Sequence, residues 1–419
     1  MSQLLSSRKA HDFDSRVKAA LDGEASAELR RLINIEELRR DGVFFTSSSL
    51  RKFAMSGICH TFDDRSVIYD PTCGAGDLLL GAANILPLRK NLSTTLRLWS
   101  NTLQANDLHP ELLEACKKRL TIAAWKRHGY SGRSETIANK EWFPGLQKAC
   151  ALTEPCGYQR ATHIIMNPPF ASRIAPDNCT WGSGSVNAAA LFLEYALMSV
   201  NPGTRIMAIL PEVIRCGSRY KKFRRMIEDN ATVTRVRSYG LFDSQTDVDV
   251  FVLELTKPTQ TKGRRQNIQW GRPVQKEDTI EDLFDVSVGP VVDFRDEKRG
   301  KWYPYLTADC VPPWGEIYDV GKRRRYRQRV IQGPFVVIRR TSRPDDEFRA
   351  VGTGIYKDCK FAVDNHLIVC KPHDGTIRSC KALLKLLKTD ITNHWLNRVI
   401  RCRHLTVGAV KNIPWSQDV

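Results

Sequence analysis

The residues best suited to chemistry form a short turn, Asn167-Pro168-Pro169-Phe170, after the apolar run HIIM. Proline fixes φ and has no backbone N–H, so the turn predicts two rigid neighbouring acceptors, the Asn167 side chain and the Pro168 carbonyl. Two acceptors suit an exocyclic amino group, and Phe170 offers a flat ring on which a base can stack. Taken alone, the motif is also compatible with a plain strand terminator. The motifs elsewhere in the chain are therefore needed to choose between the two interpretations.

A glycine-containing segment, DPTCGAGD at residues 70–77, lies nearer the N-terminus between a predicted strand and a predicted helix. Gly74 and Gly76 permit backbone conformations closed to other residues and let a ligand approach the main chain. The third glycine of the dinucleotide fingerprint is replaced by Leu79, and the phosphate-binding loop G-x-x-x-x-G-K-[ST] does not occur in the sequence. The segment favours a nucleoside-bearing cofactor other than NAD or ATP, although any tight strand-to-helix turn is the alternative.

Asp107 follows the next predicted strand, about thirty residues further on. A carboxylate at this place accepts hydrogen bonds from a ribose diol in dinucleotide-binding folds. An aspartate that caps the helix beginning near His109 is the alternative. The glycine-containing segment upstream favours the ribose interpretation.

The elements that must position these motifs alternate between short apolar runs and helical patterns. From Val43 onward, this pattern predicts strands at 66–70, 102–107, 163–167, 204–211, 232–239 and 248–256. It predicts helices at 77–85, 109–128, 186–200 and 218–229. Strands separated by helical crossovers predict an α/β fold with a mostly parallel sheet, whose ligands bind beyond the carboxyl ends of the strands. All three motifs fall at such ends.

The chain is predicted to divide into four parts: an N-terminal helical segment at 1–42, the α/β domain at 43–257, a polar linker at 258–290 and a C-terminal domain at 291–419. The C-terminal part has 25 Lys and Arg against 14 Asp and Glu, and so holds most of the formal charge of +18. We predict that it binds a polyanion. Its basic run, together with Tyr326, is expected to grip phosphates through Lys322, Arg323, Arg324, Arg325 and Arg327. A solvated basic loop is the alternative. Strands are expected in PFVVIRR and HLIVC, and one late helix over KALLKLLKTDITNHWLNRVI.

No stretch of the sequence reaches the roughly 18 apolar residues of a membrane-spanning helix, and the first residues lack the apolar run of a signal peptide. Twelve cysteines occur without a C-x-x-C pair, which predicts reduced thiols and no metal site. These features predict a cytoplasmic protein that is not exported and has no membrane partner.

Five segments resemble, in order and spacing, the gamma class of AdoMet-dependent DNA N6-adenine methyltransferases of restriction-modification type. They are FFTSSSL (44–50), DPTCGAGD (70–77), AND (105–107), NPPF (167–170) and LFLEYALMSVNPGTRIMAILPE (191–212). The resemblance implies a Rossmann-like methyltransferase domain and a smaller C-terminal DNA-recognition domain of mixed α+β structure. It also implies methyl transfer from S-adenosyl-L-methionine (AdoMet) to N6 of adenine in a specific double-stranded DNA sequence after base flipping. A restriction or specificity subunit is a further partner that the resemblance allows.

The family's motifs assign roles to residues of this sequence. The cofactor-binding positions would be Thr46, Asp70, Thr72, Gly74, Gly76, Asp107, Leu108 and Asn139. The catalytic motif would be Asn167, Pro168, Pro169 and Phe170, and the second aromatic wall of the target-base pocket would be Phe242.

Three positions depart from the family pattern. Ser47 stands where proline is usual, Asn139 where an acid is usual, and His163 where aspartate is usual. We interpret His163 as a hydrogen-bonded histidine at the start of a strand. The motifs leave three alternatives open: an RNA or protein-glutamine amino-methyltransferase, a cytosine-N4 methyltransferase, and a catalytically silent DNA-binding subunit of a modification complex.

Overall fold

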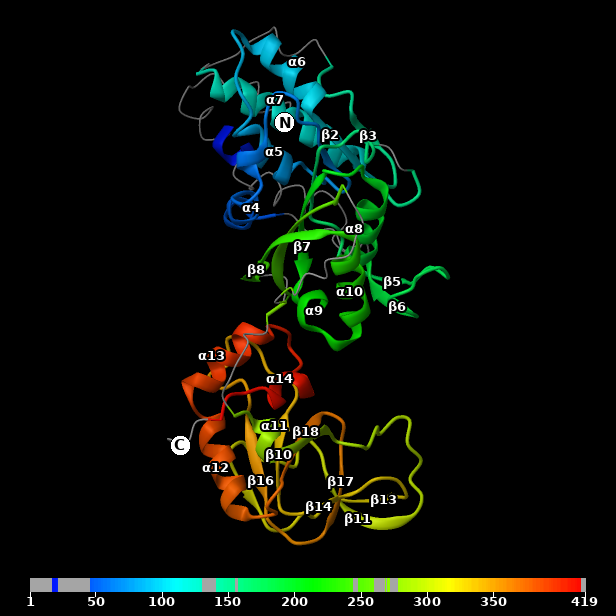
Figure 1. Ribbon diagram of the computed structural model, residues 1–419, viewed down its shortest axis with the longest axis vertical. Coiled ribbons are helices and arrows are strands. Elements are labelled where there is room, and N and C mark those ends of the chain that lie inside the picture. Colours follow the sequence, from blue (N-terminus) through cyan, green and yellow to red (C-terminus); the bar gives the residue numbers. More distant parts are fainter. Residues whose placement is uncertain are drawn as a thin grey trace. The chain divides into compact units, whose positions relative to one another are not determined.

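The computed structural model describes residues 17–21, 46–129, 141–154, 157–243, 248–259, 268, 270–271 and 278–415. The chain divides into two compact units. Unit 1 comprises Met1–Arg215 and Arg219–Ile268, and unit 2 comprises Cys216–Ser218 and Gln269–Val419. Both units can be followed by colour in Figure 1, where the chain runs from blue at the N-terminus to red at the C-terminus.

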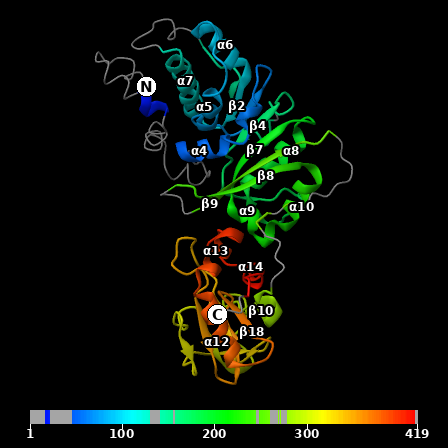
Figure 2. The same ribbon diagram turned by 60° about the vertical axis from the view of Figure 1, so that its left-hand side comes forward.

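Unit 1 contains a sheet of seven strands in the order β3-β2-β1-β4-β7-β9-β8. All pairs from β3 to β7 are parallel, whereas β9 runs antiparallel to both β7 and β8. Figure 2 shows β7, β8 and β9 side by side. The predicted mostly parallel α/β sheet is confirmed. The strands are β1 (Ile68–Asp70), β2 (Leu103–Asp107), β3 (Leu146–Lys148), β4 (His163–Met166), β7 (Arg205–Pro211), β8 (Thr232–Leu241) and β9 (Asp249–Thr256).

The helices before β8 connect these strands and cover the sheet. They are α4 (Ser48–Met55), η1 (Cys59–Thr61), α5 (Asp77–Ala83), α6 (Leu92–Thr102), α7 (Pro110–Arg127), α8 (Ala188–Ser199), α9 (Glu212–Cys216), η3 (Ser218–Tyr220) and α10 (Lys221–Asn230). The short hairpin of β5 (Ser172–Ile174) and β6 (Ser185–Asn187) lies between β4 and α8. Sequence patterns predicted α5, α7, α8 and α10, whereas α6 and the hairpin were not predicted. Within the described residues, no helix is both long enough and apolar enough to cross a membrane.

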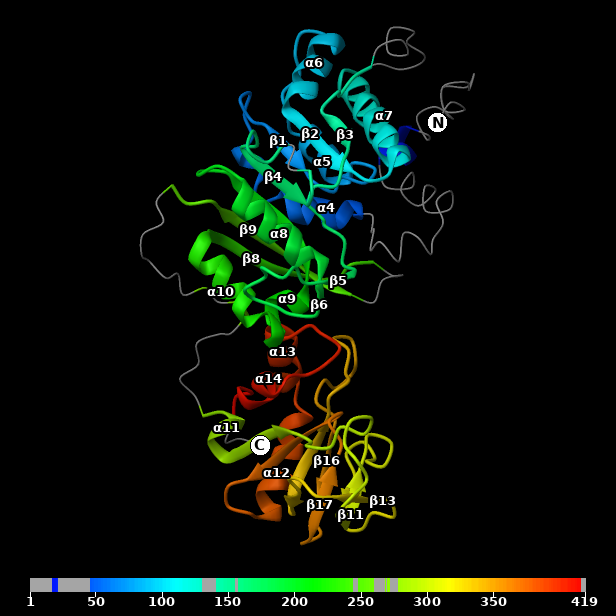
Figure 3. The same ribbon diagram turned by 90° about the vertical axis from the view of Figure 1, so that its right-hand side faces the viewer.

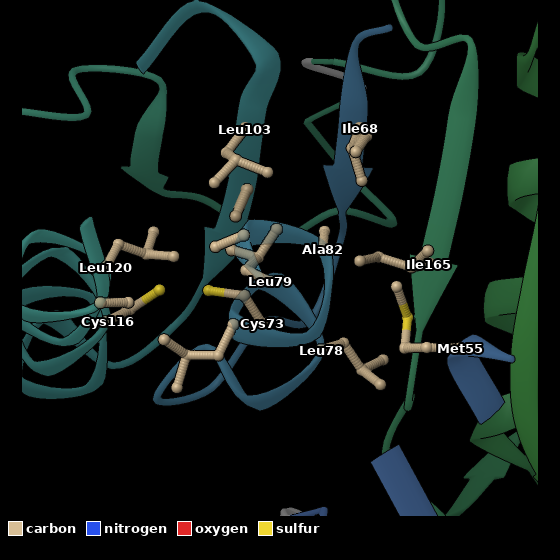
Figure 4. Close-up of a cluster of buried hydrophobic side chains, with 14 of the residues drawn as sticks. Met55, Ile68, Cys73, Leu78, Leu79, Ala82, Leu103, Cys116, Leu120 and Ile165 are labelled. Carbon is tan, nitrogen blue, oxygen red and sulfur yellow. The ribbon is translucent and has the colours of Figure 1, made fainter. Parts of the chain in front are cut away.

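The core of unit 1 lies where α5 and α7 pack against the central strands. Figure 4 shows Leu79 of α5 near Cys116 of α7, with Leu103 and Ile68 contributed by β2 and β1. Leu79, Leu103 and Ile68 are fully buried. Burial of a leucine or isoleucine side chain contributes about 1.5–3 kcal/mol, so this cluster holds the N-terminus of α5 at the carboxyl ends of β1 and β2.

Unit 2 contains two sheets and a group of helices. Its five-stranded sheet has the order β10-β18-β15-β16-β12, and its four-stranded sheet has the order β13-β11-β17-β14. Helix α12 packs on β15, β16 and β18, and Figure 3 shows it beside β16. The elements are α11 (Ile280–Leu283), β10 (Phe284–Val288), β11 (Lys301–Leu306), β12 (Glu316–Ile317), β13 (Arg323–Tyr326), β14 (Ile331–Gln332), β15 (Phe335–Arg339), β16 (Gly352–Ile355), β17 (Lys360–Val363), β18 (Leu367–Pro372), α12 (Ile377–Leu387), α13 (Asp390–Val399) and α14 (Val407–Lys411).

Two expectations about this part of the chain need correction. The predicted end of the linker at residue 290 falls after β10, although β10 pairs with β18 and belongs to the sheet of unit 2. The single late helix is two helices, because the first ends at its cap Lys388 and the second is begun by Thr389. Its side-chain oxygen accepts the N–H of Thr392, a capping bond that starts α13.

Candidate active site

The loop between β1 and α5 has a conformation that only glycine adopts without strain. Gly74 has a φ of +51° and Gly76 a φ of +84°. A side chain at Gly76 would meet Sγ of Cys116, which lies 2.3 Å from the position of an ideal Cβ. The N–H of Gly74 donates a hydrogen bond of 2.8 Å to Oδ2 of Asp107. The loop is therefore tied to the end of β2, which brings two of the predicted motifs together.

Two buried carboxylates line this end of the sheet. Burial raises the pKa of Asp70 well above its usual value, and the N–H of Thr72, which donates to Oδ1 of Asp70, opposes that rise. Burial also raises the pKa of Asp107, against the lowering effect of the N–H groups of His109 and Gly74. Among the described residues, neither carboxylate has an ion-pair partner. A cationic ligand would favour the ionised form of both groups.

A buried arginine holds the loop from behind. Arg119 is fully buried, and its guanidinium donates to the carbonyl of Ala75 at 2.6 Å, to Oδ1 of Asp77 at 2.8 Å and to the carbonyl of Ala20 at 2.8 Å. The bond to Ala75 reaches the loop itself, and the ion pair fixes the first residue of α5. Sequence reasoning missed Arg119, because nothing in the pattern of α7 distinguishes it from a surface arginine.

The Asn167 turn begins directly after β4 and is held from two sides. Nδ2 of Asn167 donates to Oγ1 of Thr46 at 3.0 Å, so the oxygen of the amide remains the acceptor atom of this side chain. The carbonyl of Phe170 accepts a 2.8 Å hydrogen bond from Nδ2 of Asn187. Oδ1 of Asn187 also accepts the N–H of Ala189 and so caps α8. Asn187 therefore couples the turn to the start of α8, a role that sequence reasoning did not predict.

A cavity of about 420 Å³ connects the glycine-containing loop with the Asn167 turn. This volume lies within the range of about 300–1,000 Å³ that small-molecule sites usually have. Eight of the predicted site residues line the cavity: Thr46, Asp70, Thr72, Gly74, Asp107, Leu108, Asn167 and Pro169. The hydroxyl of Thr72 is buried and has no hydrogen-bond partner among the described residues. A polar group of a ligand can supply that partner.

The remaining predicted residues lie elsewhere. Gly76 is the residue before α5 and supports the loop without lining the cavity, and Pro168 is buried within the turn. The rings of Phe170 and Phe242 contact each other edge to face, with centroids 5.6 Å apart. Phe242 is buried, and the described residues that line the cavity include neither ring. Asn139 lies outside the described residues.

Other lining residues were not predicted. They come from the segment after β3, from the β5 region and from α8: Ala149, Cys150, Ala151, Leu152, Thr153, Arg173, Ile174, Leu191 and Phe192. Strand β3, which occupies Leu146–Lys148, was not predicted. Because β3 pairs with β2 in parallel, the residues that follow it reach the same edge of the sheet. Recognising LQK as a strand would have indicated that the residues after it line the site.

Ser47 is explained by the structure. Its side-chain oxygen accepts the N–H of Leu50 at 3.2 Å and caps α4. Proline at this position would lack that oxygen. Serine therefore caps the helix that follows Thr46.

His163 lies at the start of β4, in agreement with its interpretation as a hydrogen-bonded histidine. Its Nε2 lies 2.9 Å from Oγ1 of Thr61, and its Nδ1 lies 2.8 Å from Oγ1 of Thr162. Burial, assisted by the positive charge of Arg205, lowers the pKa of His163 to about 4. The imidazole is therefore neutral at pH 7 and belongs to the supporting structure.

This histidine predicts an acid-sensitive fold. Its pKa in the folded state is lower than the value of about 6.5 in an unfolded chain, so the unfolded state binds more protons and stability falls as the pH drops from 6.5 towards 4. At pH 5 we expect wild type to have lost about 2 kcal/mol of unfolding free energy that His163→Gln does not lose. Urea unfolding of both proteins at pH 7.5 and pH 5 measures this difference. The exposed His60→Gln is the control and should behave like wild type. Equal losses in wild type and His163→Gln would contradict the prediction.

The basic run of unit 2 includes strand β13, which has one exposed face and one buried face. Lys322, Arg323, Arg325 and Arg327 are exposed, whereas Arg324 and Tyr326 are buried. Arg324 forms an ion pair with Asp293 and donates to the carbonyl of Asp296. The hydroxyl of Tyr326 donates to the carbonyl of Pro290 at 2.9 Å. Alternation along β13 turns these two side chains inward, so we remove Arg324 and Tyr326 from the expected phosphate contacts.

Known proteins resemble this chain in sequence and in fold. A family model described as N-6 DNA Methylase matches residues 33–299. The modification methylase CviBIII of Paramecium bursaria Chlorella virus NC1A is 20% identical over 409 residues, which cover 93% of this chain and 98% of that relative.

Among solved structures, the type IIL restriction-modification enzyme MmeI, in complex with DNA, matches with a TM-score of 0.51 and 13% identity, covering 97% of this chain and 69% of MmeI. The type IIG restriction endonuclease BpuSI matches with a TM-score of 0.49 and 15% identity, covering 95% of this chain. The aligned region spans 62% of the length of BpuSI. The likeness to MmeI supports the fold of this chain.

Proposed function

Since the chain belongs to the N-6 DNA methylase family of adenine-specific DNA methyltransferases, we propose that it methylates N6 of adenine in a specific double-stranded DNA sequence, with AdoMet as the donor. One observation carries this proposal. The cavity that contains the glycine-containing loop and the carboxylates Asp70 and Asp107 is also lined by Asn167 and Pro169. The glycine-containing loop, the two carboxylates and the acceptor side chain of Asn167 therefore border one space.

Membership of the family implies AdoMet as the cofactor, and the residues of the cavity fit this molecule. Its sulfonium and ammonium groups are cationic, which suits the buried carboxylates of Asp70 and Asp107. The partnerless hydroxyl of Thr72 can bond to its methionine end, and Gly74 leaves the approach to the main chain open. Thr46 and Leu108 complete the proposed cofactor contacts, with Asn139 as a further proposed contact. When bound, AdoMet supplies a methyl group on a positively charged sulfur.

The Asn167 turn would activate the target nitrogen. The lone pair of an adenine amino group is delocalised into the ring, which makes the nitrogen a poor nucleophile. Oδ1 of Asn167 and the carbonyl of Pro168 would accept its two hydrogens, favour a tetrahedral nitrogen and stabilise the positive charge that develops there. Thr46, which accepts from Nδ2 of Asn167, would keep the amide oxygen directed to this task. Preorganised acceptors make a strong base unnecessary.

The target adenine would have to leave the duplex, because a base stacked inside it cannot reach the Asn167 turn. We propose that Phe170 and Phe242 receive the flipped base. Since their rings contact each other edge to face, one ring must turn aside before a base can stack on Phe170. Base–aromatic stacking of about 1–3 kcal/mol would offset part of the cost of extrusion.

We propose that unit 2 binds the DNA around the target, through phosphate contacts of Lys322, Arg323, Arg325 and Arg327. All four side chains are exposed. Dependence on a restriction or specificity subunit is a second proposal, and it is tested by whether the purified chain methylates DNA alone.

Transfer of labelled methyl from AdoMet to duplex DNA tests the proposed function. We expect label in DNA, none in tRNA or release factors, and N6-methyladenine as the product after digestion to nucleosides. Label in RNA or protein, or N4-methylcytosine as the product, would refute the proposal. Absence of AdoMet binding with DNA present would instead support the silent subunit.

Asn187 is expected to act as a positioning residue for the Asn167 turn. Asn187→Asp keeps the oxygen that caps α8 but loses the N–H that donates to the carbonyl of Phe170. We expect its kcat to fall about tenfold with little change in KM for AdoMet, since a small misplacement of an acceptor is costly. Asn187→Ala loses both bonds and should also lose about 1 kcal/mol of stability.

Single-turnover methylation and urea unfolding of the two variants separate these effects. If the role of Asn187 is purely structural, kcat should fall only where stability falls. Asn187→Asp keeps the cap of α8, so it should then retain wild-type kcat. That result would remove Asn187 from the positioning role.

A further inference from the structure

The strands β11 and β13 form an antiparallel ribbon at the edge of unit 2. In its register Trp302 lies opposite Arg325, and Pro304 lies opposite Arg323. Because side chains alternate across a strand, Trp302, Arg323 and Arg325 share one face of the ribbon. That face is solvent-exposed, and Trp302 retains 60% of its surface. The opposite face carries the buried Arg324 and Tyr326, which anchor the ribbon to the core of unit 2.

Arg325 is preorganised on this face. Its Nε donates a 3.1 Å hydrogen bond to the carbonyl of Gly300. Gly300 has a φ of +100°, and a Cβ there would lie 2.5 Å from the carbonyl oxygen of Tyr326, so the turn that presents this carbonyl requires glycine. The bond uses Nε, so the two terminal nitrogens of the guanidinium are not needed for it. A guanidinium held in this way loses less conformational entropy on binding than a mobile one.

The charges around the ribbon favour a polyanion. Asp309 pairs with Lys322, and Asp364 accepts hydrogen bonds from His366 and Tyr305, so these acids are already engaged within unit 2. Among the described residues, Arg325 has no acidic partner, and Arg323 interacts electrostatically with Asp319 without forming an ion pair. A cavity of about 550 Å³ adjoins the ribbon and is lined by Trp302, Arg323 and Arg325, among others.

We propose that the outer face of the β11–β13 ribbon enters the major groove of the target DNA and that Arg325 specifies one guanine of the recognised sequence. The inference rests on the proposed function and deepens it. The major groove admits a two-stranded ribbon, and the guanidinium fork bonds guanine at O6 and N7 together. Trp302, opposite Arg325, supplies apolar contact to the neighbouring base pair, and Arg323 contacts the backbone.

Selection of bound duplexes from a random library tests the proposal without requiring methylation. The full chain is used, and recovered DNA is sequenced for wild type, Arg325→Ala, Arg325→Lys and the control Lys301→Ala. Lys301 lies on the same ribbon and is exposed, but alternation places it on the opposite face. All four proteins are first compared by thermal unfolding, and Arg325→Lys keeps the charge if Arg325→Ala folds poorly.

We expect wild type and Lys301→Ala to enrich the same motif. Arg325→Ala should lose the preference for one guanine, by about 5- to 150-fold, and keep the other positions. Arg325→Lys should fail to restore that preference, because an ammonium cannot form the bidentate contact. An unchanged motif in Arg325→Ala, restoration by lysine, or no motif in wild type would each overturn the proposal. A wild type that enriches a motif but methylates no adenine would refute the proposed function while leaving this inference intact.

Discussion

Asn167→Ala is expected to lower the rate of methyl transfer by at least about 10²–10³-fold, the effect of removing one preorganised group that stabilises developing charge. The affinity for AdoMet should stay nearly intact. The reason is positional: Asn167 follows β4, whereas the loop and the two carboxylates that fit the cofactor lie at the ends of β1 and β2. The loss therefore concerns the target nitrogen and not the donor.

Single-turnover methylation of a duplex containing the recognised site measures the rate, and calorimetric titration with AdoMet measures the affinity. Asn101→Ala is a matched control, because Asn101 is exposed on α6 and away from the cavity lining. Retention of substantial activity by Asn167→Ala would remove Asn167 from catalysis. A parallel loss of AdoMet binding would assign it to the cofactor site instead.

Arg119→Leu is expected to reduce the free energy of unfolding by about 3–5 kcal/mol, the usual cost of breaking a buried ion pair by removing one partner. The side chain of Asp77 is 6% exposed and would lose its counter-charge, and the carbonyl of Ala75 would lose a donor. Because Ala75 belongs to the loop that lines the cavity, the same substitution should weaken AdoMet binding in the protein that still folds.

Urea unfolding with and without AdoMet measures both effects. Arg97→Leu is the control, because Arg97 is exposed on α6 and its substitution should change stability by less than about 0.5 kcal/mol. Equal stability of the Arg119→Leu and Arg97→Leu proteins would show that the buried pair contributes little beyond the packing of the arginine stem.

The fold of unit 1 follows largely from local patterns. Runs such as HIIM in β4 and RIMAILP in β7 are mostly apolar over the length of one strand, and they are bounded by Asn167 and Pro211. Such runs separated by amphipathic helices leave few arrangements other than a parallel sheet with crossovers. The strands β3 and β5 were missed because they have only three residues each and are largely exposed, so they carry little periodic signal.

The amino-acid sequence by itself indicated eight of the residues that line the cavity. Parallel strands place their carboxyl ends at one edge, so any chain with this strand order brings the segments after β1, β2 and β4 together. Tertiary structure alone decided what supports them. Arg119 and Asn187 bond to groups 44 and 17 residues away, and no local pattern specifies such partners. It also decided that Arg324 is buried and Arg325 exposed, because adjacent residues of a strand face opposite sides and only packing selects the inner one.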